Sequence, residues 1–310
     1  MGRLDRPLDD VLRRIEPSEA QKDGAKRSHQ HLRERLSSGN IGTRVLDSYL
    51  SGSYARDTAI SPLDDVDIIV VIDPIPWRSG LDAFFEWNPS PSRVLRTFAN
   101  AIRYRYPDSS LHMQRRSVRL ELDHLNLDVV PAIQRGNDNG IIYIGDTEDG
   151  EWIKTAPKLH AETTTVVNKQ RDGLFKPLVK LVKRWNASLP ETAHLRSFVV
   201  ETIAVRLFQQ VGYASLEEGL HKYFDFLAYL GDYDTAYRWG EAYGISTFLF
   251  SFTVPDTADT GSNTAAGVGF WRRCSFFRYA ARSRDRLRAA MDAKSDETAI
   301  ARLHEALRLS

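Results

Sequence analysis

The pattern of apolar and polar residues changes about halfway along the chain. The first half has short runs typical of strands and one helical stretch between them: strands at 44–50, 66–72, 117–122 and 126–130, and a helix at 92–106. Before them, Ser18 and Gln21 have the spacing of a capping box, and the charged residues that follow predict a long helix up to Leu36. This half therefore predicts a mixed α/β lobe.

The second half has the apolar spacing of helices. The helical stretches are 174–189, 197–211, 216–230 and 270–290, and residues 253–269 form a loop rich in Thr, Gly, Asp and Ala. We therefore expect an α+β protein with two lobes, a mixed α/β lobe over residues 1–160 and a helical lobe over residues 161–310.

Composition narrows the class of protein. The 310 residues are 42% hydrophobic and 27% charged, which is ordinary for a folded soluble protein, and the net charge is only +1. The single cysteine, Cys274, excludes a disulfide within the chain and a zinc site built of several thiolates. The start lacks an apolar signal core, and no apolar run approaches the ~20 residues that span a bilayer. We expect a cytoplasmic protein with no membrane partner.

Candidate chemistry begins at a Gly-Ser pair that follows the first predicted strand. At Gly52 and Ser53, backbone N–H groups and a hydroxyl could approach a phosphate closely. Asp65 and Asp67 follow two residues apart on the next strand, so their carboxylates share one face. Two adjacent carboxylates repel each other unless a cation lies between them, and a pair of Mg²⁺ ions about 4 Å apart would also support phosphoryl or nucleotidyl transfer.

A third carboxylate would complete such a site. Asp128 lies inside the apolar run 125–131, where a charge is costly without a partner. An Asp pair at the start of a strand is also common as a simple turn or helix cap. The combination with Gly52, Ser53 and Asp128 favours the metal site over that structural interpretation.

These motifs resemble the nucleotidyltransferases of the DNA polymerase beta superfold. Within it, the order of motifs resembles the CD-NTases, the group of cyclic GMP-AMP synthase and dinucleotide cyclases, which are relatives of oligoadenylate synthase. The resemblance covers roughly residues 18–210, and its motifs are Gly52-Ser53 with Thr58, Asp65-Val66-Asp67, Leu127-Asp128-Val129-Val130-Pro131, Leu181-Val182-Lys183-Arg184-Trp185 and Ser197-Phe198-Val199-Val200-Glu201. It implies a catalytic lobe that holds two magnesium ions and a helical lobe that closes over nucleoside triphosphates.

The resemblance also assigns binding roles to residues for which spacing alone indicates none. Lys183 matches a lysine that contacts the donor triphosphate, Ser53 and Ser197 match phosphate ligands, and Phe198 matches an aromatic residue that stacks on a base. Most relatives have Tyr at the Phe198 position, and a core phenylalanine is the alternative. On a helical wheel Lys176, Lys180 and Lys183 lie opposite the apolar side, which predicts a solvated face for the first two.

The resemblance implies a cyclic oligonucleotide synthase. It would be a magnesium-dependent enzyme, with Mn²⁺ as a substitute, that joins NTPs into a second messenger for anti-phage (CBASS) signalling through a separate effector protein. Asp65, Asp67 and Asp128 would be its catalytic and metal-binding residues. The alternatives are a nucleotidyltransferase acting on an RNA or small-molecule acceptor, and a catalytically silent nucleotide-binding scaffold, against which the three carboxylates argue.

Two basic runs also have the pattern of nucleic-acid surfaces. In Arg103-Tyr104-Arg105-Tyr106-Pro107 and Arg115-Arg116, basic and aromatic residues interleave, but amphipathic strands and helix ends have the same pattern. With a net charge of +1 and no cluster of Cys and His ligands, we expect no obligatory nucleic-acid activator.

Overall fold

The chain folds into two compact units. The computed structural model describes residues 2–38, 41, 43–73, 89–134, 140–232, 240–248 and 251–309. One unit is Pro17–Ala161, and the other combines Met1–Glu16 with Glu162–Ser310. The expected first lobe, residues 1–160, therefore differs at its start, because helix α1 (Asp5–Ile15) groups with the helical unit. The physical reason is its apolar side, where Leu8, Val11 and Ile15 are buried and the helix contacts α7 and α9 of that unit.

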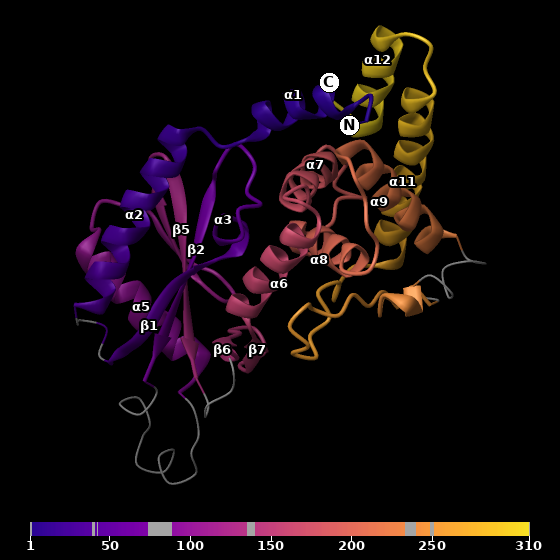
Figure 1. The fold of residues 1–310 in the computed structure, drawn as a ribbon. Helices are drawn as coiled ribbons and strands as arrows, with labels where there is room; N and C mark the ends of the chain where they lie inside the picture. Colours follow the sequence, from indigo (N-terminus) through magenta and orange to yellow (C-terminus); the bar gives the residue numbers. More distant parts are fainter. Residues whose placement is uncertain are drawn as a thin grey trace. The chain divides into compact units, whose positions relative to one another are not determined.

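A seven-stranded sheet is the framework of the first unit (Figure 1). The strand order is β1-β2-β5-β4-β3, and β6 and β7 extend the sheet from β5. The pair β2 and β5 is parallel, and the other strand pairs are antiparallel. The strands are β1 (Val45–Ser51), β2 (Asp65–Ile72), β3 (Leu111–Met113), β4 (Val118–Leu122), β5 (Leu125–Ile133), β6 (Ile142–Gly145) and β7 (Trp152–Thr155).

Two helices, α2 (Glu19–Ser37) and α5 (Pro91–Arg105), cover one face of this sheet (Figure 1). Alternate strand residues such as Val66, Ile68 and Leu127 share a core with Leu32 of α2 and Phe98 of α5. Successive strand side chains point to opposite faces, so the residues between them face away from the helices. Asp65, Asp67 and Asp128 are among those residues. The sheet thus separates the candidate carboxylates from the helix layer.

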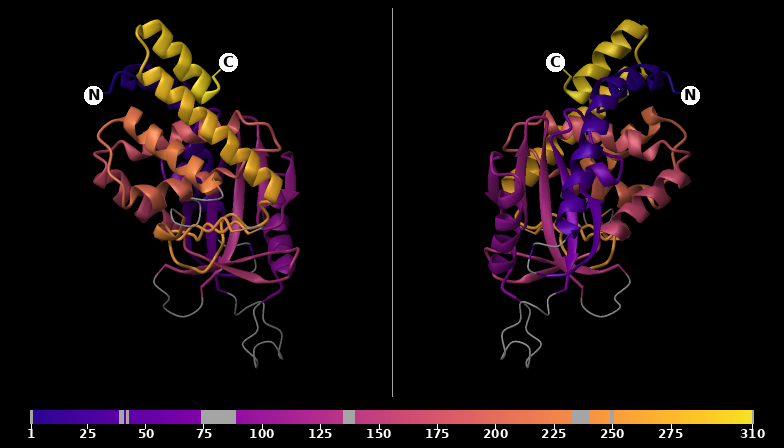
Figure 2. Two further views of the ribbon diagram at one scale, coloured as in Figure 1. Left: turned by 90° about the vertical axis from the view of Figure 1, so that its right-hand side faces the viewer. Right: turned by 90° about the vertical axis from the view of Figure 1, so that its left-hand side faces the viewer.

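Helices dominate the second unit. They are α7 (Phe175–Ala187), α8 (Ser197–Phe208), α9 (Leu216–Gly231), α11 (Phe270–Met291) and α12 (Asp296–Leu307), and α6 (Pro157–Gln170) runs from the first unit into this one. Figure 2 shows α11 and α12 as an antiparallel pair. Trp185 of α7 is fully buried against Phe224 and Phe276, and its indole N–H donates to Ser283 Oγ over 2.9 Å. This satisfied aromatic cluster anchors α7, α9 and α11 together.

The structure confirms the α+β class and the elements expected from the sequence, with end shifts of a few residues. It also confirms the capping box, because Ser18 Oγ accepts from the Gln21 N–H while Gln21 Oε1 accepts from the Ser18 N–H. The sequence analysis missed the short strands β3, β6 and β7 and the helices α6 and α12. Strands of three or four residues carry too little periodicity to be recognised.

No helix in the described part of the chain is long and apolar enough to cross a membrane.

Candidate active site

Pairing of two parallel strands brings the predicted carboxylates together. Asp67 of β2 and Asp128 of β5 are register partners, and Asp65 lies two residues before Asp67, opposite Asn126. Register partners in neighbouring strands point to the same face of the sheet. All three carboxylates therefore lie on one face, the one opposite α2 and α5.

Burial and the neighbouring negative charges make Asp67 costly to ionise. The pKa of Asp67 is raised to about 6, first by burial and then by the negative charges of Asp65 and Asp128. Arg56 and Arg119 act in the opposite direction but do not cancel the effect. A cation placed among the carboxylates would remove both the repulsion and the cost of burying charge.

The Gly-Ser turn packs directly against Asp67. Ser51 is the register partner of Asp67, and the next residue, Gly52, begins the one-turn helix α3 (Gly52–Ala55) with a φ of 67°. A Cβ at Gly52 would lie 1.8 Å from Asp67 Oδ2, so only glycine fits this approach. Ser53 is partly buried, and its carbonyl accepts from the Thr58 N–H over 2.9 Å. Gly52 thus makes room for a carboxylate, a role that the sequence analysis did not foresee.

Arg119 is a site residue that the sequence analysis missed. It is the register partner of Asp128 across the β4–β5 hairpin, and its Nε and Nη2 donate to Asp128 Oδ1 and Oδ2 over 3.0 and 2.6 Å. The hydrogen bonds to Asp128 are the main reason that the pKa of Arg119 is raised. The signal was present in the sequence, because the tight turn at Asp123-His124 places residue 119 opposite residue 128.

The three carboxylates have the chemistry of ligands for a divalent cation and lie on the same face of the sheet. Their oxygen atoms are not, however, arranged around a single point. No group of three or more His, Cys, Asp or Glu side chains within the described ranges is arranged to hold a metal ion, and Asp128 is directed at Arg119 instead. Carboxylate oxygens are nevertheless the ligands that Mg²⁺ prefers, and the three on this face repel one another. In ligand type the residues present therefore fit such an ion.

The predicted lysine and its neighbours lie in the helical unit. Lys183 of α7 is only 4% exposed, and its Nζ lies 3.9 Å from Glu201 Oε2 of α8, which is 2% exposed. Ser197 is exposed at the first residue of α8, and Phe198 beside it is partly buried. Phe198 is thus not part of the fully buried core.

The solvated lysine face expected on α7 is wrong for Lys180. This residue is 7% exposed, and its Nζ donates to Glu16 Oε2 over 2.7 Å. α1 and α8 pack on α7 and cover this side of the helix, which a helical wheel of α7 alone does not show.

In the loop of residues 253–269, the side chains of Asp256, which follows Pro255, and of Asn263 accept hydrogen bonds from backbone N–H groups of the same loop. Asp256 is buried and accepts from the backbone N–H groups of Ala258, Thr260 and Ser262, while Asn263 Oδ1 accepts from those of Val254 and Ala265. These hydrogen bonds show that Asp and Asn act here as turn-forming residues.

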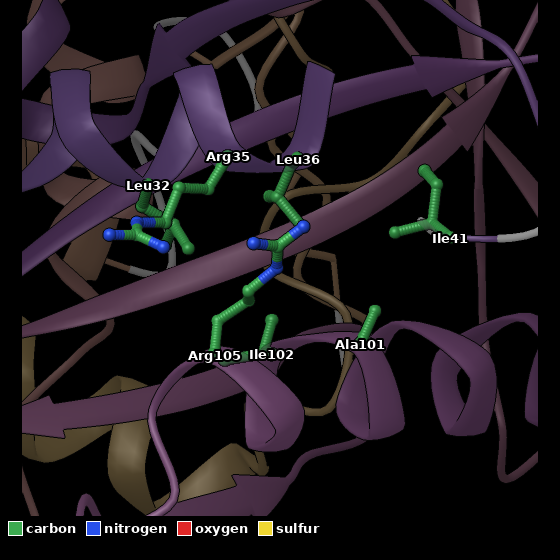
Figure 3. Close-up of a pocket in the computed structure, with 7 residues that line it drawn as sticks. All are labelled: Leu32, Arg35, Leu36, Ile41, Ala101, Ile102 and Arg105. Carbon is green, nitrogen blue, oxygen red and sulfur yellow. The ribbon is translucent and has the colours of Figure 1, made fainter. Parts of the chain in front are cut away.

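A pocket between α2 and α5 lies on the other face of the sheet. Figure 3 shows the guanidinium groups of Arg35 and Arg105 at this pocket, together with Leu36 and Ile102. The pocket is therefore separate from the carboxylates.

Comparison with known proteins identifies the family. Residues 3–168, more than half of the chain, match the model of the Second Messenger Oligonucleotide or Dinucleotide Synthetase (SMODS) domain. The chain belongs to the SMODS family. The resemblance to the CD-NTases is thereby confirmed, and membership implies a divalent metal cofactor.

Two curated relatives show how far the sequence similarity of this SMODS protein extends. It is 34% identical over 208 residues to a cyclic AMP-AMP-AMP synthase of Acinetobacter sp., covering 64% of this chain and 56% of that protein. It is 27% identical over 189 residues to a cyclic UMP-AMP synthase of Rhodothermus marinus, covering 54% and 64%. The matched part thus spans little more than half the length of these relatives.

Solved structures show the same fold over nearly the whole chain. The complex of Escherichia coli MS115-1 CdnC with HORMA-deltaN has a TM-score of 0.76 at 20% identity and covers 98% of this chain and 97% of that one. The Vibrio cholerae DncV cyclic AMP-GMP synthase with a linear intermediate has a TM-score of 0.71 at 12% identity, with coverage of 98% and 93%. At these identities the likeness shows the fold alone.

Proposed function

We propose that this SMODS protein is a nucleotidyltransferase that joins nucleoside triphosphates into a cyclic oligonucleotide and releases pyrophosphate at each step. The observation that carries the proposal is the pairing of Asp67 with Asp128 on parallel strands, with Asp65 on the same face. Membership of the SMODS family and the cyclic nucleotide synthases among the relatives point the same way.

Asp65, Asp67 and Asp128 hold Mg²⁺ in this proposal, and Mn²⁺ can replace it. When bound, the metal activates the acceptor hydroxyl and stabilises the charge of the leaving pyrophosphate. Asp65 and Asp67 would be shared ligands of the metal site. Asp128 would be a ligand on the acceptor side and would help to take the proton of the attacking 2′ or 3′ hydroxyl. The raised pKa of Asp67 supports this assignment, because it reflects a buried carboxyl beside two negative charges, whose ionised form a cation would stabilise.

Five further residues bind the nucleotides in this proposal. Gly52 and Ser53 contact phosphate from the turn beside Asp67, and Ser197 does so from the exposed N-terminus of α8, where helix N–H groups attract anions. Phe198 stacks on a base. Lys183 contacts the donor triphosphate, and its Nζ lies 3.9 Å from Glu201 Oε2 of the neighbouring helix.

The proposed product acts as a second messenger. The protein would work in the cytoplasm as part of an anti-phage (CBASS) system, in which a separate effector protein binds the cyclic product. A CBASS oligonucleotide cyclase of Escherichia coli, CdnC, is 26% identical over 188 residues and supports this setting.

Product analysis tests the proposal. The purified protein is incubated with all four NTPs and Mg²⁺ or Mn²⁺, treated with phosphatase and analysed by mass spectrometry. Cyclic products resist phosphatase because they have no terminal phosphate, and the double variant Asp65→Asn/Asp67→Asn should make none. Linear products, or extension of an added RNA or small-molecule acceptor, would instead indicate a nucleotidyltransferase that acts on such an acceptor. Nucleotide binding without turnover would indicate a catalytically silent scaffold.

A further inference from the structure

Arg119 and Asp128 form a two-point contact at the centre of the candidate site. The residues face each other across β4 and β5, and each donated hydrogen bond ends on a different carboxylate oxygen, at 3.0 and 2.6 Å. The side chain of Asp128 is 7% exposed and that of Arg119 is 29% exposed. A planar guanidinium that binds both oxygens fixes the plane of the carboxylate as well as its position.

Arg119 also acts on the other two carboxylates. Its charge interacts with that of Asp65, and it opposes the rise in the pKa of Asp67. A cation so close to three carboxylates has two opposite consequences for metal binding. Its charge repels a divalent ion, while its hydrogen bonds hold Asp128 in one orientation.

We propose that Arg119 is a positioning residue that orients the Asp128 carboxylate for divalent metal binding. Each carboxylate oxygen has two lone pairs, and the guanidinium uses one on each, so both oxygens keep one for a metal ion. The inference rests on the proposed function because it uses the same carboxylates.

Arg119→Lys separates orientation from charge. Lysine keeps the positive charge but has a single ammonium group that cannot bind both oxygens in a fixed plane. We expect the affinity for Mn²⁺ alone, measured without nucleotide by the electron paramagnetic resonance signal of free Mn²⁺, to fall about tenfold. The Mn²⁺ concentration for half-maximal product formation should rise by a similar factor, and excess Mn²⁺ should restore most of kcat.

Arg116→Lys is the matched control. Arg116 also donates to a buried carboxylate in the same unit, that of Asp146, with Nε 2.9 Å from Oδ2. Asp146 is outside the group of three carboxylates, so this variant should leave Mn²⁺ affinity unchanged. Thermal unfolding of both variants shows whether each is folded at the temperature of the binding experiment.

A double-mutant cycle with Asp128→Asn tests whether Arg119 affects metal binding through Asp128. If Arg119 acts through Asp128, Arg119→Lys should weaken Mn²⁺ binding in the wild-type background and have little further effect beside Asp128→Asn. An equal loss in both backgrounds would overturn the inference.

The outcomes also distinguish this inference from the proposed function. Unchanged or tighter Mn²⁺ binding by a folded Arg119→Lys would overturn the positioning role while leaving cyclic product synthesis intact. Weaker Mn²⁺ binding in a protein that makes no cyclic product would support the positioning role and overturn the proposed product. A wild-type protein that binds no Mn²⁺ would overturn both.

Discussion

Asp67 combines, in a single side chain, the burial and the repulsion that a metal site must overcome. Its carboxyl is packed against Gly52 and paired in register with Asp128, and its pKa of about 6 lies above the usual 3.8. Between these two values the folded protein keeps a proton that the unfolded chain releases. Stability therefore falls as the pH rises from about 4 to about 6, and the full cost is present above pH 6.

Asp67→Asn should stabilise the metal-free protein above pH 6 and abolish synthesis. The gain in unfolding free energy should be at most about 3 kcal/mol, since one pKa unit corresponds to about 1.4 kcal/mol. Below pH 4 the gain should vanish. Urea unfolding in EDTA at several pH values measures it, and Asp64→Asn, at an exposed residue just before β2, is the control. A gain that is independent of pH would contradict the explanation.

Gly52→Ala should cost both stability and activity. The added Cβ would meet Asp67 Oδ2 at 1.8 Å, and it would also strain a backbone with a φ of 67°. Gly150→Ala is a close control, because Gly150 has a φ of 71° but nothing lies within 4 Å of an added Cβ. The control should lose about 1 kcal/mol from backbone strain alone. Gly52→Ala should lose more in urea unfolding, with at least a tenfold lower rate of synthesis; equal losses in the two variants would show that the contact with Asp67 is unimportant.

At the scale of elements, helices α7 and α8 are joined by a buried charge pair. Lys183 and Glu201 are both nearly inaccessible to solvent, with charged atoms 3.9 Å apart. A charge that loses its partner in such a place is costly, whereas removing both charges often is not. Lys183, a proposed ligand of the triphosphate, therefore also contributes to the stability of the helical unit through this pair.

Lys183→Ala should lower the free energy of unfolding by about 3 kcal/mol, because Glu201 stays buried without the lysine's charge. This differs from the small loss that a solvated lysine would imply. The double variant Lys183→Met/Glu201→Gln should recover most of the stability and keep a raised KM for NTP. Urea unfolding and steady-state kinetics on both variants measure the two effects. Normal kinetics in the stable double variant would show that Lys183 has only a structural role.

At the scale of the whole molecule, the distribution of charge determines how strongly the protein binds polyanions such as nucleic acids. The net charge is +1, and in the structure one of the two basic runs, Arg115-Arg116, is paired with acidic residues. Arg115 pairs with Asp146, Glu148 and Asp149, and Arg116 pairs with Asp146. Neutralised arginines contribute little to binding a phosphate backbone.

Synthesis should therefore need only NTPs and a divalent metal. Adding long duplex DNA or RNA to nuclease-treated enzyme at low salt should change the rate by less than about threefold. Phosphatase-resistant product measured over time provides the readout. A stimulation of about tenfold or more would show a nucleic-acid sensor, with the surface around Arg103 and Arg105 as the first place to examine.

The sequence by itself determined the local features of this protein. Short apolar runs predicted the strands that carry Asp67 and Asp128, and a capping box predicted the start of α2, because these signals depend only on neighbours along the chain. The order of motifs was sufficient to recognise the family.

Tertiary structure alone decided which side chains meet. The parallel register that sets Asp67 beside Asp128 and the packing of Gly52 on Asp67 join residues that belong to different elements of the chain. The burial of Lys180 and Lys183 depends on α1 and α8, which a helical wheel of α7 cannot include. Register, burial and charge pairing are properties of contacts between distant segments, so the periodicity of any one segment does not contain them.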